Sequence, residues 1–595
     1  MEKNTTRQDE QFTLHGKGYL LKRLFAYMIP FKREVLLVLV LMIFVMVVGL
    51  INPYFIRQAI DVYIAREDIP SLVIVTIVVL LLNILSAYAS KVRIFKMGIV
   101  SNKIVLKLRE NLFEHIQKLS FSFFDSRPVG KILARVVGDV NALQKLFANS
   151  VTSFLPQIFQ LLLVTLLMFT LNIKLALATM AVMPVLGLLL FLIEIKSRPL
   201  WQEMRGKRSN LNAFTHESFS GIKILQGFSQ EESSREIHNE MVKEMSGSFM
   251  KAVTLNDLFW PLVETSWGLG AIVVYFVGVN LVVGNEVSLG TLIAFTMYAS
   301  MFWRPVMNIT NFYNTLITNF SAAERIFEVL DINPEIENIE NSTTMPTING
   351  DVAFEKVTFS YEDGVEVLKD VSFRIRQGES IALVGETGAG KTTIVNLISR
   401  FYDPDSGSIL VDGTNVRDVT LESLRSQMGI MLQDTFLFSA SIKDNIRYGK
   451  LDATDEEIVD AARAVNAHEF ISALENGYDT EVKERGSRLS VGQRQLISFA
   501  RVFLANPRIL ILDEATSNID TQTEKLVQEG IKALLKSRTS FVIAHRLSTI
   551  RDCDRIMVVN DGIISETGTH SELLVRKGIY YNLYMSQYRF INEGI

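Results

Sequence analysis

Six long apolar stretches dominate the first half of the chain. They are uninterrupted by more than an occasional charge and lie at residues 35–55, 71–89, 151–170, 175–195, 258–283 and 289–303. A helix needs about 20 apolar residues to cross the hydrocarbon core of a bilayer, and these stretches are close to that length. The pattern therefore predicts six transmembrane helices rather than the buried helices of a water-soluble core.

Two connections between these spans are unusually long, at residues 91–149 and 196–256. Both show amphipathic helical periodicity with few helix breakers, and structureless loops of this length are uncommon. We expect transmembrane helices that continue beyond the membrane and turn back. The turns are expected near 121–130, where Pro128 and Gly130 interrupt the helix, and near 221–228.

The pattern changes after the sixth span. Residues 321–327 still look helical, 333–350 form a polar linker that contains proline, and 352–361 alternate as a strand does. Strand and helix patterns then follow one another to the C-terminus, which predicts an α/β domain with a mainly parallel sheet. The expected domains are a six-helix, all-α transmembrane domain at 1–332 with long cytoplasmic helical extensions, a linker at 333–350 and the α/β domain at 351–595.

Lysine and arginine gather before the first span and after the second and fourth. Cytoplasmic loops of membrane proteins carry this excess of positive charge. We therefore expect a multi-pass protein of the cytoplasmic membrane with both termini and the α/β domain in the cytoplasm. The first twelve residues are polar and charged, so no signal peptide is expected.

Composition agrees with this division. Hydrophobic residues make up 48% of the 595 positions, and the formal net charge of −4 gives no indication of a nucleic-acid partner. The single cysteine, Cys553, cannot form an internal disulfide and is expected to be structural.

A glycine-rich loop follows the apolar strand 381–384 and precedes a helix that starts at Thr392. The loop and first helical residues are Gly385, Glu386, Thr387, Gly388, Ala389, Gly390, Lys391, Thr392 and Thr393. Backbone N–H groups and a helix N-terminus in this order bind phosphates. Lys391 is expected to contact the outer phosphates of ATP, and the Thr392 hydroxyl to ligate Mg²⁺.

Asp513 and Glu514 directly follow the apolar strand 509–512. A carboxylate at the end of a strand can hold Mg²⁺, and a second one can activate the water that attacks a phosphate. An Asp-Glu pair alone is ordinary surface, but its position behind a buried strand and after a phosphate loop favours the catalytic interpretation.

Between these motifs lies the pentapeptide Leu489, Ser490, Val491, Gly492 and Gln493. The three motifs in this order resemble the nucleotide-binding domain of ABC transporters, and together with the six spans they resemble an exporter-type half-transporter over nearly the whole chain. The resemblance implies that Glu514 is the catalytic base, that Tyr361 stacks on adenine, that Gln433 contacts Mg²⁺ and that His545 contacts the γ-phosphate. It also implies that the two cytoplasmic turns couple the membrane domain to ATPase domains, and that Ser490, Gly492 and Gln493 bind the ATP held by a second subunit.

Val491 departs from the family pattern, in which this position is glycine. Its β-branched side chain adds bulk and disfavours a positive φ. Because Lys391, Asp513, Glu514 and His545 are all present, the change is expected to affect the partner's ATP site. We therefore favour a heterodimer with a second half-transporter, while a homodimer stays open.

Substrate contacts are predicted from the fifth and sixth spans. Glu264 lies between Trp260 and Trp267, and Tyr298 and Met301 follow in the sixth span. An ionisable group in the membrane is a functional candidate, although Glu264 paired to Arg304 or to a hydroxyl would serve packing alone.

The sequence thus predicts an ATPase that exports amphipathic or hydrophobic small molecules, drug-like compounds or lipids, by alternating access within a lipid membrane. The alternatives are an ATP-gated channel or regulator on the same scaffold, and a lipid flippase that acts as a homodimer. An importer is disfavoured because the membrane and ATPase domains are fused.

Overall fold

The chain folds into two compact units. The computed structural model describes residues 17–362, 364–431, 435–483, 486, 488–513, 521–543 and 547–592. Described residues up to Gln117 and the segment Gly130–Asp331 form the first unit, while Lys118–Val129 and the described residues from Ile332 onward form the second. Gln433, Glu514 and His545 lie outside the described residues.

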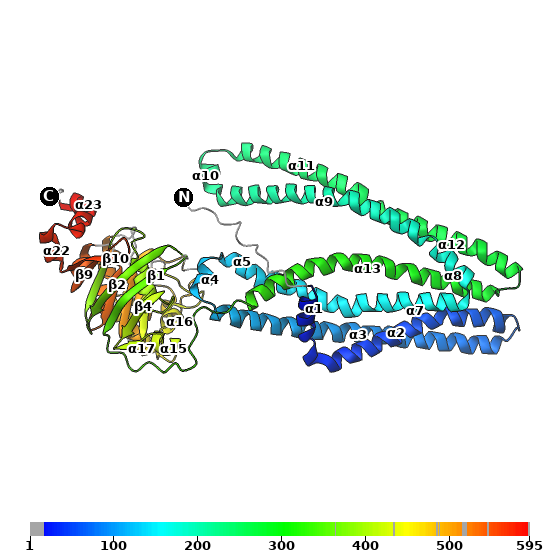
Figure 1. Cartoon of the computed structure of the whole chain (residues 1–595), viewed down its shortest axis with the longest axis horizontal. Coiled ribbons are helices and arrows are strands. Elements are labelled where there is room, and N and C mark those ends of the chain that lie inside the picture. Colours follow the sequence, from blue (N-terminus) through cyan, green and yellow to red (C-terminus); the bar gives the residue numbers. More distant parts are fainter. Residues whose placement is uncertain are drawn as a thin grey trace. The chain divides into compact units, whose positions relative to one another are not determined.

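The first unit is helical (Figure 1). Its elements are α1 (Lys17–Ala26), η1 (Ile29–Phe31), α2 (Lys32–Gln58), η2 (Ala59–Ile64), α3 (Ile69–Lys118), α5 (Val129–Leu133), η3 (Ala134–Asp139), α6 (Val140–Asn149), η4 (Ser150–Phe154), α7 (Leu155–Leu171), α8 (Ile173–Met180), α9 (Met183–Ser220), α10 (Ile222–Gly227), α11 (Glu231–Asn256), α12 (Phe259–Val283) and α13 (Leu289–Leu330).

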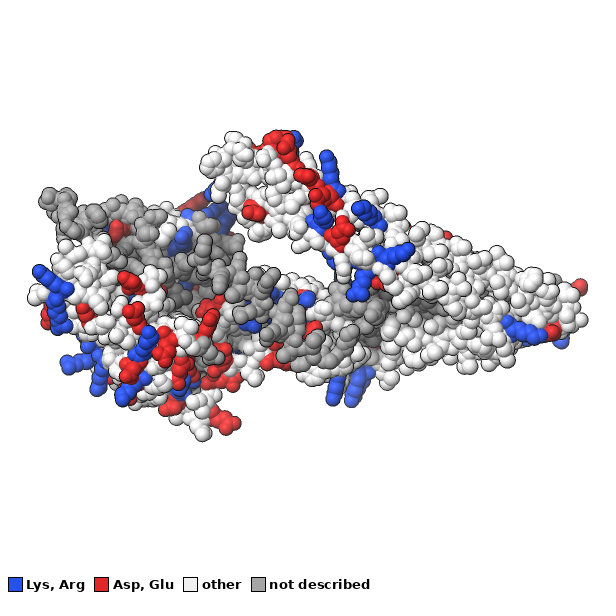
Figure 2. Space-filling view, turned by 45° about the horizontal axis from the view of Figure 1, so that its top comes forward, with Lys and Arg blue, Asp and Glu red and all other residues white. Residues whose placement is uncertain are grey.

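Five helical stretches among the described residues are long and apolar enough to cross a membrane. They are Ile29–Ile64, Ile69–Lys118, Val129–Leu171, Ile173–Ser220 and Glu231–Val283. The sixth predicted span falls on α13, where the apolar part Leu289–Phe302 is shorter. On the face shown in Figure 2, the part of this unit that carries the spans forms a broad band almost free of charged side chains.

The two long connections are helices, as the periodicity predicted. α3 continues without a break from the second span to Lys118, so its 50 residues extend about 75 Å at 1.5 Å per residue. α9 and α11 run side by side (Figure 1), where Trp201 meets Phe249 edge to face with ring centroids 6.3 Å apart and Lys207 pairs with Glu244. The short α10 joins them at the second predicted turn.

Within its described residues, the second unit contains α4 (Phe121–Asp125) and ten strands. The strands are β1 (Val352–Ser360), β2 (Glu366–Ile375), β3 (Ser380–Val384), β4 (Ser406–Val411), β5 (Thr414–Asn415), β6 (Met428–Met431), β7 (Ile509–Asp513), β8 (Thr539–Ile543), β9 (Arg555–Asn560) and β10 (Ile563–Gly568). The later helices and helical turn are α14 (Lys391–Ile398), α15 (Leu421–Arg425), α16 (Ile442–Arg447), α17 (Asp455–Ala464), α18 (His468–Ser472), η5 (Gly477–Asp479), α19 (Val491–Ala505), α20 (Thr521–Leu535), α21 (Leu547–Arg551), α22 (His570–Arg576) and α23 (Ile579–Asn592).

The strands form two sheets. In the six-stranded sheet, of order β10-β9-β3-β8-β7-β6, every neighbouring pair is parallel except β10 with β9. The four-stranded sheet, β2-β1-β4-β5, is entirely antiparallel. The expected α/β fold is confirmed for the larger sheet. The second sheet was missed, because β1 and β2 read as ordinary alternating strands whose pairing the pattern does not reveal.

The segment 333–350 is packed rather than extended as a free linker. Met345 and Ile348 are buried against the core of the two sheets, and the carboxylate of Asp412 accepts hydrogen bonds from the N–H groups of Asn349, Gly350 and Asp351 at 2.5, 3.1 and 2.9 Å. Cys553 is buried and donates to the Thr549 carbonyl, consistent with a structural role.

Candidate nucleotide site

The phosphate loop starts at the carboxyl end of β3, a fully buried strand between β8 and β9. A Cβ at Gly385 would lie 2.1 Å from the Val559 carbonyl oxygen, so only glycine fits beside β9 at this point. Gly390, the residue before α14, has φ +105°, and a Cβ there would meet the Leu368 side chain at 2.8 Å. The loop geometry therefore depends on both glycines.

α14 begins directly after this loop, and Gly390 offers no side-chain cap to its first N–H groups. These donors, together with the positive end of the helix, fit an anion. Lys391 is buried with 8% of its surface exposed, and its Nζ donates to the carbonyl oxygens of Gly385 and Glu386, each at 2.8 Å. Burial lowers the pKa of Lys391, and the nearby Asp513 carboxylate opposes that shift. The donor set of loop amides, helix N-terminus and ammonium group matches a nucleotide phosphate.

The parallel strands place further candidate residues at the same edge of the sheet. Asp513 is the last residue of β7 and pairs in register with Ile543, the last residue of β8, which in turn lies next to β3. Since parallel strands end at a common edge, Asp513 and the phosphate loop share it. Gln433, Glu514 and His545 follow β6, β7 and β8 in the sequence and lie outside the described residues, so their placement at this edge stays a prediction.

Tyr361 lies beside the phosphate-loop helix. Its ring is 47% exposed, and its hydroxyl is 3.2 Å from Oγ1 of Thr393 in α14. Tyr361 is therefore exposed next to the phosphate-loop helix, and its contact with adenine stays a prediction.

A residue that sequence reasoning missed lies behind Tyr361. The Tyr402 ring meets Tyr361 edge to face with centroids 5.1 Å apart, and its hydroxyl donates to the Asp125 carboxylate at 2.6 Å. Burial, followed by the hydrogen bond to Asp125, raises the pKa of Tyr402, so its hydroxyl stays protonated as a donor. The aromatic pair Phe401-Tyr402, soon after α14, was the available signal.

Asp125 belongs to α4, the first predicted turn, which packs within the second unit. Phe121 of α4 lies against Phe401 with ring centroids 4.9 Å apart, and the hydroxyls of Ser120 and Ser122 donate to Glu335 at 3.3 and 2.6 Å. The turn thus contacts the α/β unit through both aromatic and polar side chains.

The pentapeptide forms the start of α19. Ser490 is the N-cap: its hydroxyl accepts from the Gln493 N–H at 3.2 Å, and the Gln493 side chain accepts from the Ser490 N–H at 2.9 Å. Gly492 is buried, while Val491 is 37% exposed as the first residue of the helix. This capping box holds the helix N-terminus in a defined position.

The substrate candidates divide into two environments. Trp260, Glu264 and Trp267 are the second, sixth and ninth residues of α12 and are all exposed, and their spacing places them on one face. Tyr298 is instead buried, with its hydroxyl donating to the Leu50 carbonyl at 2.7 Å, and Met301 is half-buried. Tyr298 therefore packs α13 against α2 in this structure.

Comparison with known proteins matches both halves of the chain. Residues 35–306 match the ABC transporter transmembrane region, and 368–517 match the ABC transporter family. An uncharacterized ABC transporter ATP-binding protein of Bacillus subtilis, YknV, is 43% identical and aligns over 95% of this chain and 94% of its own length. An ATP-dependent lipid A-core flippase of Syntrophus aciditrophicus is 37% identical over 90% and 89%.

The structure of a bacterial Atm1-family ABC exporter with ATP bound has a TM-score of 0.76, 28% identity, and covers 94% of this chain and 98% of its own. One ATPase unit and one membrane unit on a single chain define an ATP-driven half-transporter. The chain belongs to the ABC exporters, and its ATP hydrolysis is coupled to transport across a membrane.

Proposed function

We propose that this chain is one half of a dimeric exporter that moves amphipathic or hydrophobic molecules, drug-like compounds or lipids, out of the cytoplasm. The observation that carries the proposal is that the described part of the chain holds one phosphate loop, one strand that ends in Asp513, one helix capped at the pentapeptide, and one helical membrane unit. Family members bind each ATP between the phosphate loop of one subunit and the pentapeptide, called the signature, of the other. A second subunit is therefore required.

The charge pattern supports an orientation with the ATPase unit in the cytoplasm. Lysine and arginine gather before the first predicted span and after the second and fourth. The positive-inside rule assigns that side, and both termini, to the cytoplasm.

Hydrolysis would take place at the edge where β3, β7 and β8 end. Thr392 and Asp513 would hold Mg²⁺, with Gln433 as a further contact, and Mg²⁺ commonly needs only one or two protein ligands when phosphates supply the rest. When bound, the ion neutralises charge on the phosphates. Glu514 would take the proton of the attacking water and His545 would contact the γ-phosphate.

The second cytoplasmic turn supports assembly with another subunit. Around α10, the side chains of Phe219, Ile224 and Phe228 are 71%, 69% and 75% exposed. Such large apolar side chains at the tip of a long helical hairpin are typical of a surface covered by a partner. Val491 favours a partner that differs from this chain, because a bulky side chain on the signature helix faces the other subunit's ATP.

The exposed face of α12 supports an amphipathic substrate. Glu264 has no ion-pair partner among the described side chains, and it lies between two exposed tryptophans. A carboxylate flanked by aromatic rings suits a cationic, apolar molecule. The flippase activity named for the relative from Syntrophus aciditrophicus makes lipids a second substrate class on the same surface.

The proposal is tested with the purified transporter in sealed vesicles, by measuring ATP turnover and the ATP-driven accumulation of a fluorescent cationic amphiphile. Glu514→Gln should lower both by more than about a hundredfold, because loss of a general base typically costs 10²–10⁴-fold, while nucleotide binding is kept. Glu524→Gln, a carboxylate on α20, is the matched control and should leave both near wild type.

The alternatives give different results in the same vesicles. An ATP-gated channel would pass the amphiphile only down its gradient, and Glu514→Gln would then not abolish flux. Turnover close to wild type in Glu514→Gln would remove this residue from the catalytic role.

A further inference from the structure

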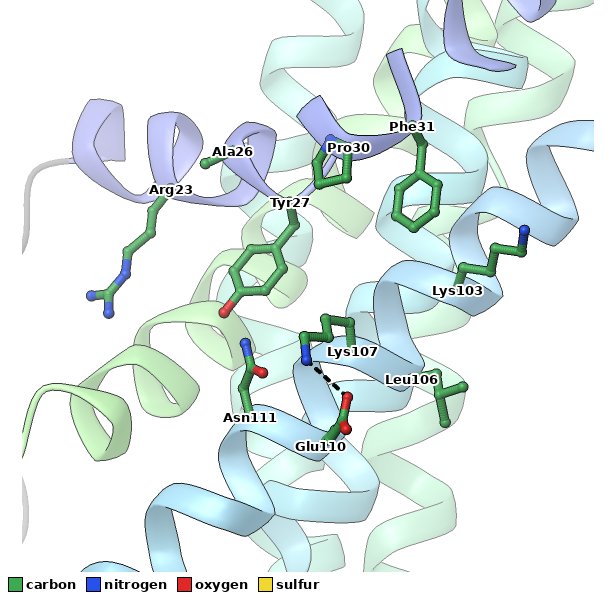
Figure 3. A pocket seen from close by; sticks show the side chains of 10 residues that line it. All are labelled: Arg23, Ala26, Tyr27, Pro30, Phe31, Lys103, Leu106, Lys107, Glu110 and Asn111. Carbon is green, nitrogen blue, oxygen red and sulfur yellow. Dashed lines mark hydrogen bonds and ion pairs between the residues drawn. The ribbon is translucent and has the colours of Figure 1, made fainter. Parts of the chain in front are cut away.

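A groove lies between the N-terminal helix and the third helix of the first unit (Figure 3). It encloses about 630 Å³, and its walls come from α1 with η1 on one side and from α3 on the other. The rings of Tyr27 and Phe31 point toward α3, and Pro30 and Leu106 complete an apolar lining. The groove is thus mostly apolar and large enough for part of a lipid.

Basic side chains surround this apolar lining. Lys103 and Lys107 come from α3 and Arg23 from α1. Arg23 forms an ion pair with Asp331 at 2.6 Å. Lys107 forms an ion pair with Glu110 at 3.0 Å, and both of these side chains are about 60% exposed, so the pair is weak. Lys103 forms no ion pair with any described residue, so Lys103 and the weakly held Lys107 are available to an anion.

An exposed apolar stripe leads from the second membrane span to the groove. Phe95, Ile99 and Leu106 are 66%, 36% and 64% exposed, and their spacing of four and seven residues places them on one face of α3. Leu106 is part of the groove lining. A hydrocarbon chain could follow this stripe without leaving apolar surface.

α1 lies where such a ligand is abundant. Its buried residues Leu20 and Leu24 anchor it to the unit, whereas Phe25 and Ile29, just before α2 enters its apolar span, are 54% and 65% exposed. A short helix that buries one apolar face against the protein and exposes further apolar side chains lies in the interface of a membrane. The groove is therefore at headgroup depth.

We propose that this groove binds one anionic phospholipid of the cytoplasmic leaflet. The ammonium groups of Lys103 and Lys107 hold its phosphate, Tyr27 and Phe31 cover the glycerol region, and an acyl chain lies along Leu106, Ile99 and Phe95. The site is separate from the ATP edge and from the α12 face, and only its assignment to the cytoplasmic leaflet rests on the proposed orientation.

The test is titration of the delipidated, purified transporter with phosphatidylglycerol or with phosphatidylcholine of identical chains, read by native mass spectrometry. Each lysine near a membrane surface contributes roughly a fivefold gain for an anionic lipid, so phosphatidylglycerol should bind about tenfold more tightly or better. The double variant Lys103→Gln with Lys107→Gln should remove this preference.

Two further variants make the test specific. Lys251→Gln neutralises an exposed lysine on α11, shortly before the fifth predicted span and outside the groove, and should keep the preference. Ala26→Trp fills the groove from an exposed position of α1 and should weaken binding of both lipids, with an unchanged elution profile showing that the protein still folds.

Equal binding of the two lipids to the wild type, or an equal loss in Lys251→Gln, would overturn the proposal. Competition by glycerol phosphate as effective as by phosphatidylglycerol would also overturn it, because the site would then bind a soluble anion. Since no step requires ATP turnover or transport, the result does not depend on the Glu514→Gln experiment.

Discussion

At the scale of the single residue, the structure changes the physical explanation of how Val491 acts. The sequence argument was that valine disfavours a positive φ. Val491 is instead the first residue of α19, in ordinary helical backbone, and the Ser490–Gln493 capping box forms around it. The valine therefore introduces no backbone strain, and its effect is confined to an exposed side chain on the surface that we propose faces another subunit.

We predict that Val491→Gly raises ATP turnover of dimers built from this chain alone, because it removes bulk beside the partner's ATP. The free energy of unfolding should fall by no more than about 1 kcal/mol, the usual penalty for glycine in a helix. Steady-state hydrolysis and thermal unfolding measure the two effects. Ser490→Ala is the contrasting variant: it loses the cap, at about 1 kcal/mol, and should lower turnover. Unchanged turnover in Val491→Gly would show that the valine does not limit the site.

The phosphate loop shows how much of a site a sequence can reveal. The loop glycines and Lys391 were predicted because the loop follows the buried strand β3 in the sequence. Asp513 was predicted because it ends the buried strand β7. Tyr402 was not found, because its partner Asp125 is 277 positions away and no local pattern connects them.

At the scale of elements, α4 is joined to the nucleotide site by a short series of side chains. Asp125 accepts from Tyr402, the Tyr402 ring contacts Tyr361, and Tyr361 lies beside α14. Tyr361 is thus two contacts away from α4, the first with Tyr402 and the second from Tyr402 to Asp125.

We expect Tyr402→Phe to weaken the stimulation of ATP turnover by substrate while leaving basal turnover and nucleotide affinity near wild type. The substitution keeps the ring contacts with Phe359 and Tyr361 but removes the hydroxyl that donates to Asp125. Loss of one hydrogen bond to a charged group corresponds to about 1.5–3 kcal/mol. Turnover with and without substrate gives the readout. Asp125→Asn, which keeps an acceptor oxygen, should retain most of the stimulation, and equal defects in both variants would argue against this role.

The element-level predictions succeeded where periodicity was long and failed where pairing was non-local. The 50-residue α3 and the 38-residue α9 were foreseen as continuous helices because amphipathic and apolar patterns run through them. The antiparallel pairing of β1 with β2 and β4 was not foreseen, because short alternating strands do not specify their neighbours.

At the scale of the whole molecule, the chain is a half-transporter. It supplies one of each component of the ATP site, and it leaves an apolar surface at the α10 tip. The sequence motifs predicted the family, the two-part organisation and the ATPase activity. They do not identify the partner subunit, because the residues that select the partner make their contacts with another chain.

The heterodimer proposal predicts that the chain purified alone hydrolyses ATP at least about tenfold more slowly than when co-expressed with a half-transporter that carries an unmodified signature. Size-exclusion chromatography and ATP turnover of the two preparations test this directly. Adding Val491→Gly to the chain alone should recover part of the difference. A stable homodimer with full, substrate-stimulated activity would contradict the proposal.

The packing of α4 on Phe401 and Tyr402 has a consequence for biosynthesis. The turn leaves the ribosome 277 residues before Tyr402, which at 5–20 residues per second is a delay of roughly 15 to 55 seconds. During that interval the ring of Phe121 lacks the Phe401 ring against which it packs. The ATPase unit can therefore reach its native fold only after a segment made long before it, between two membrane insertions, has been kept from aggregating.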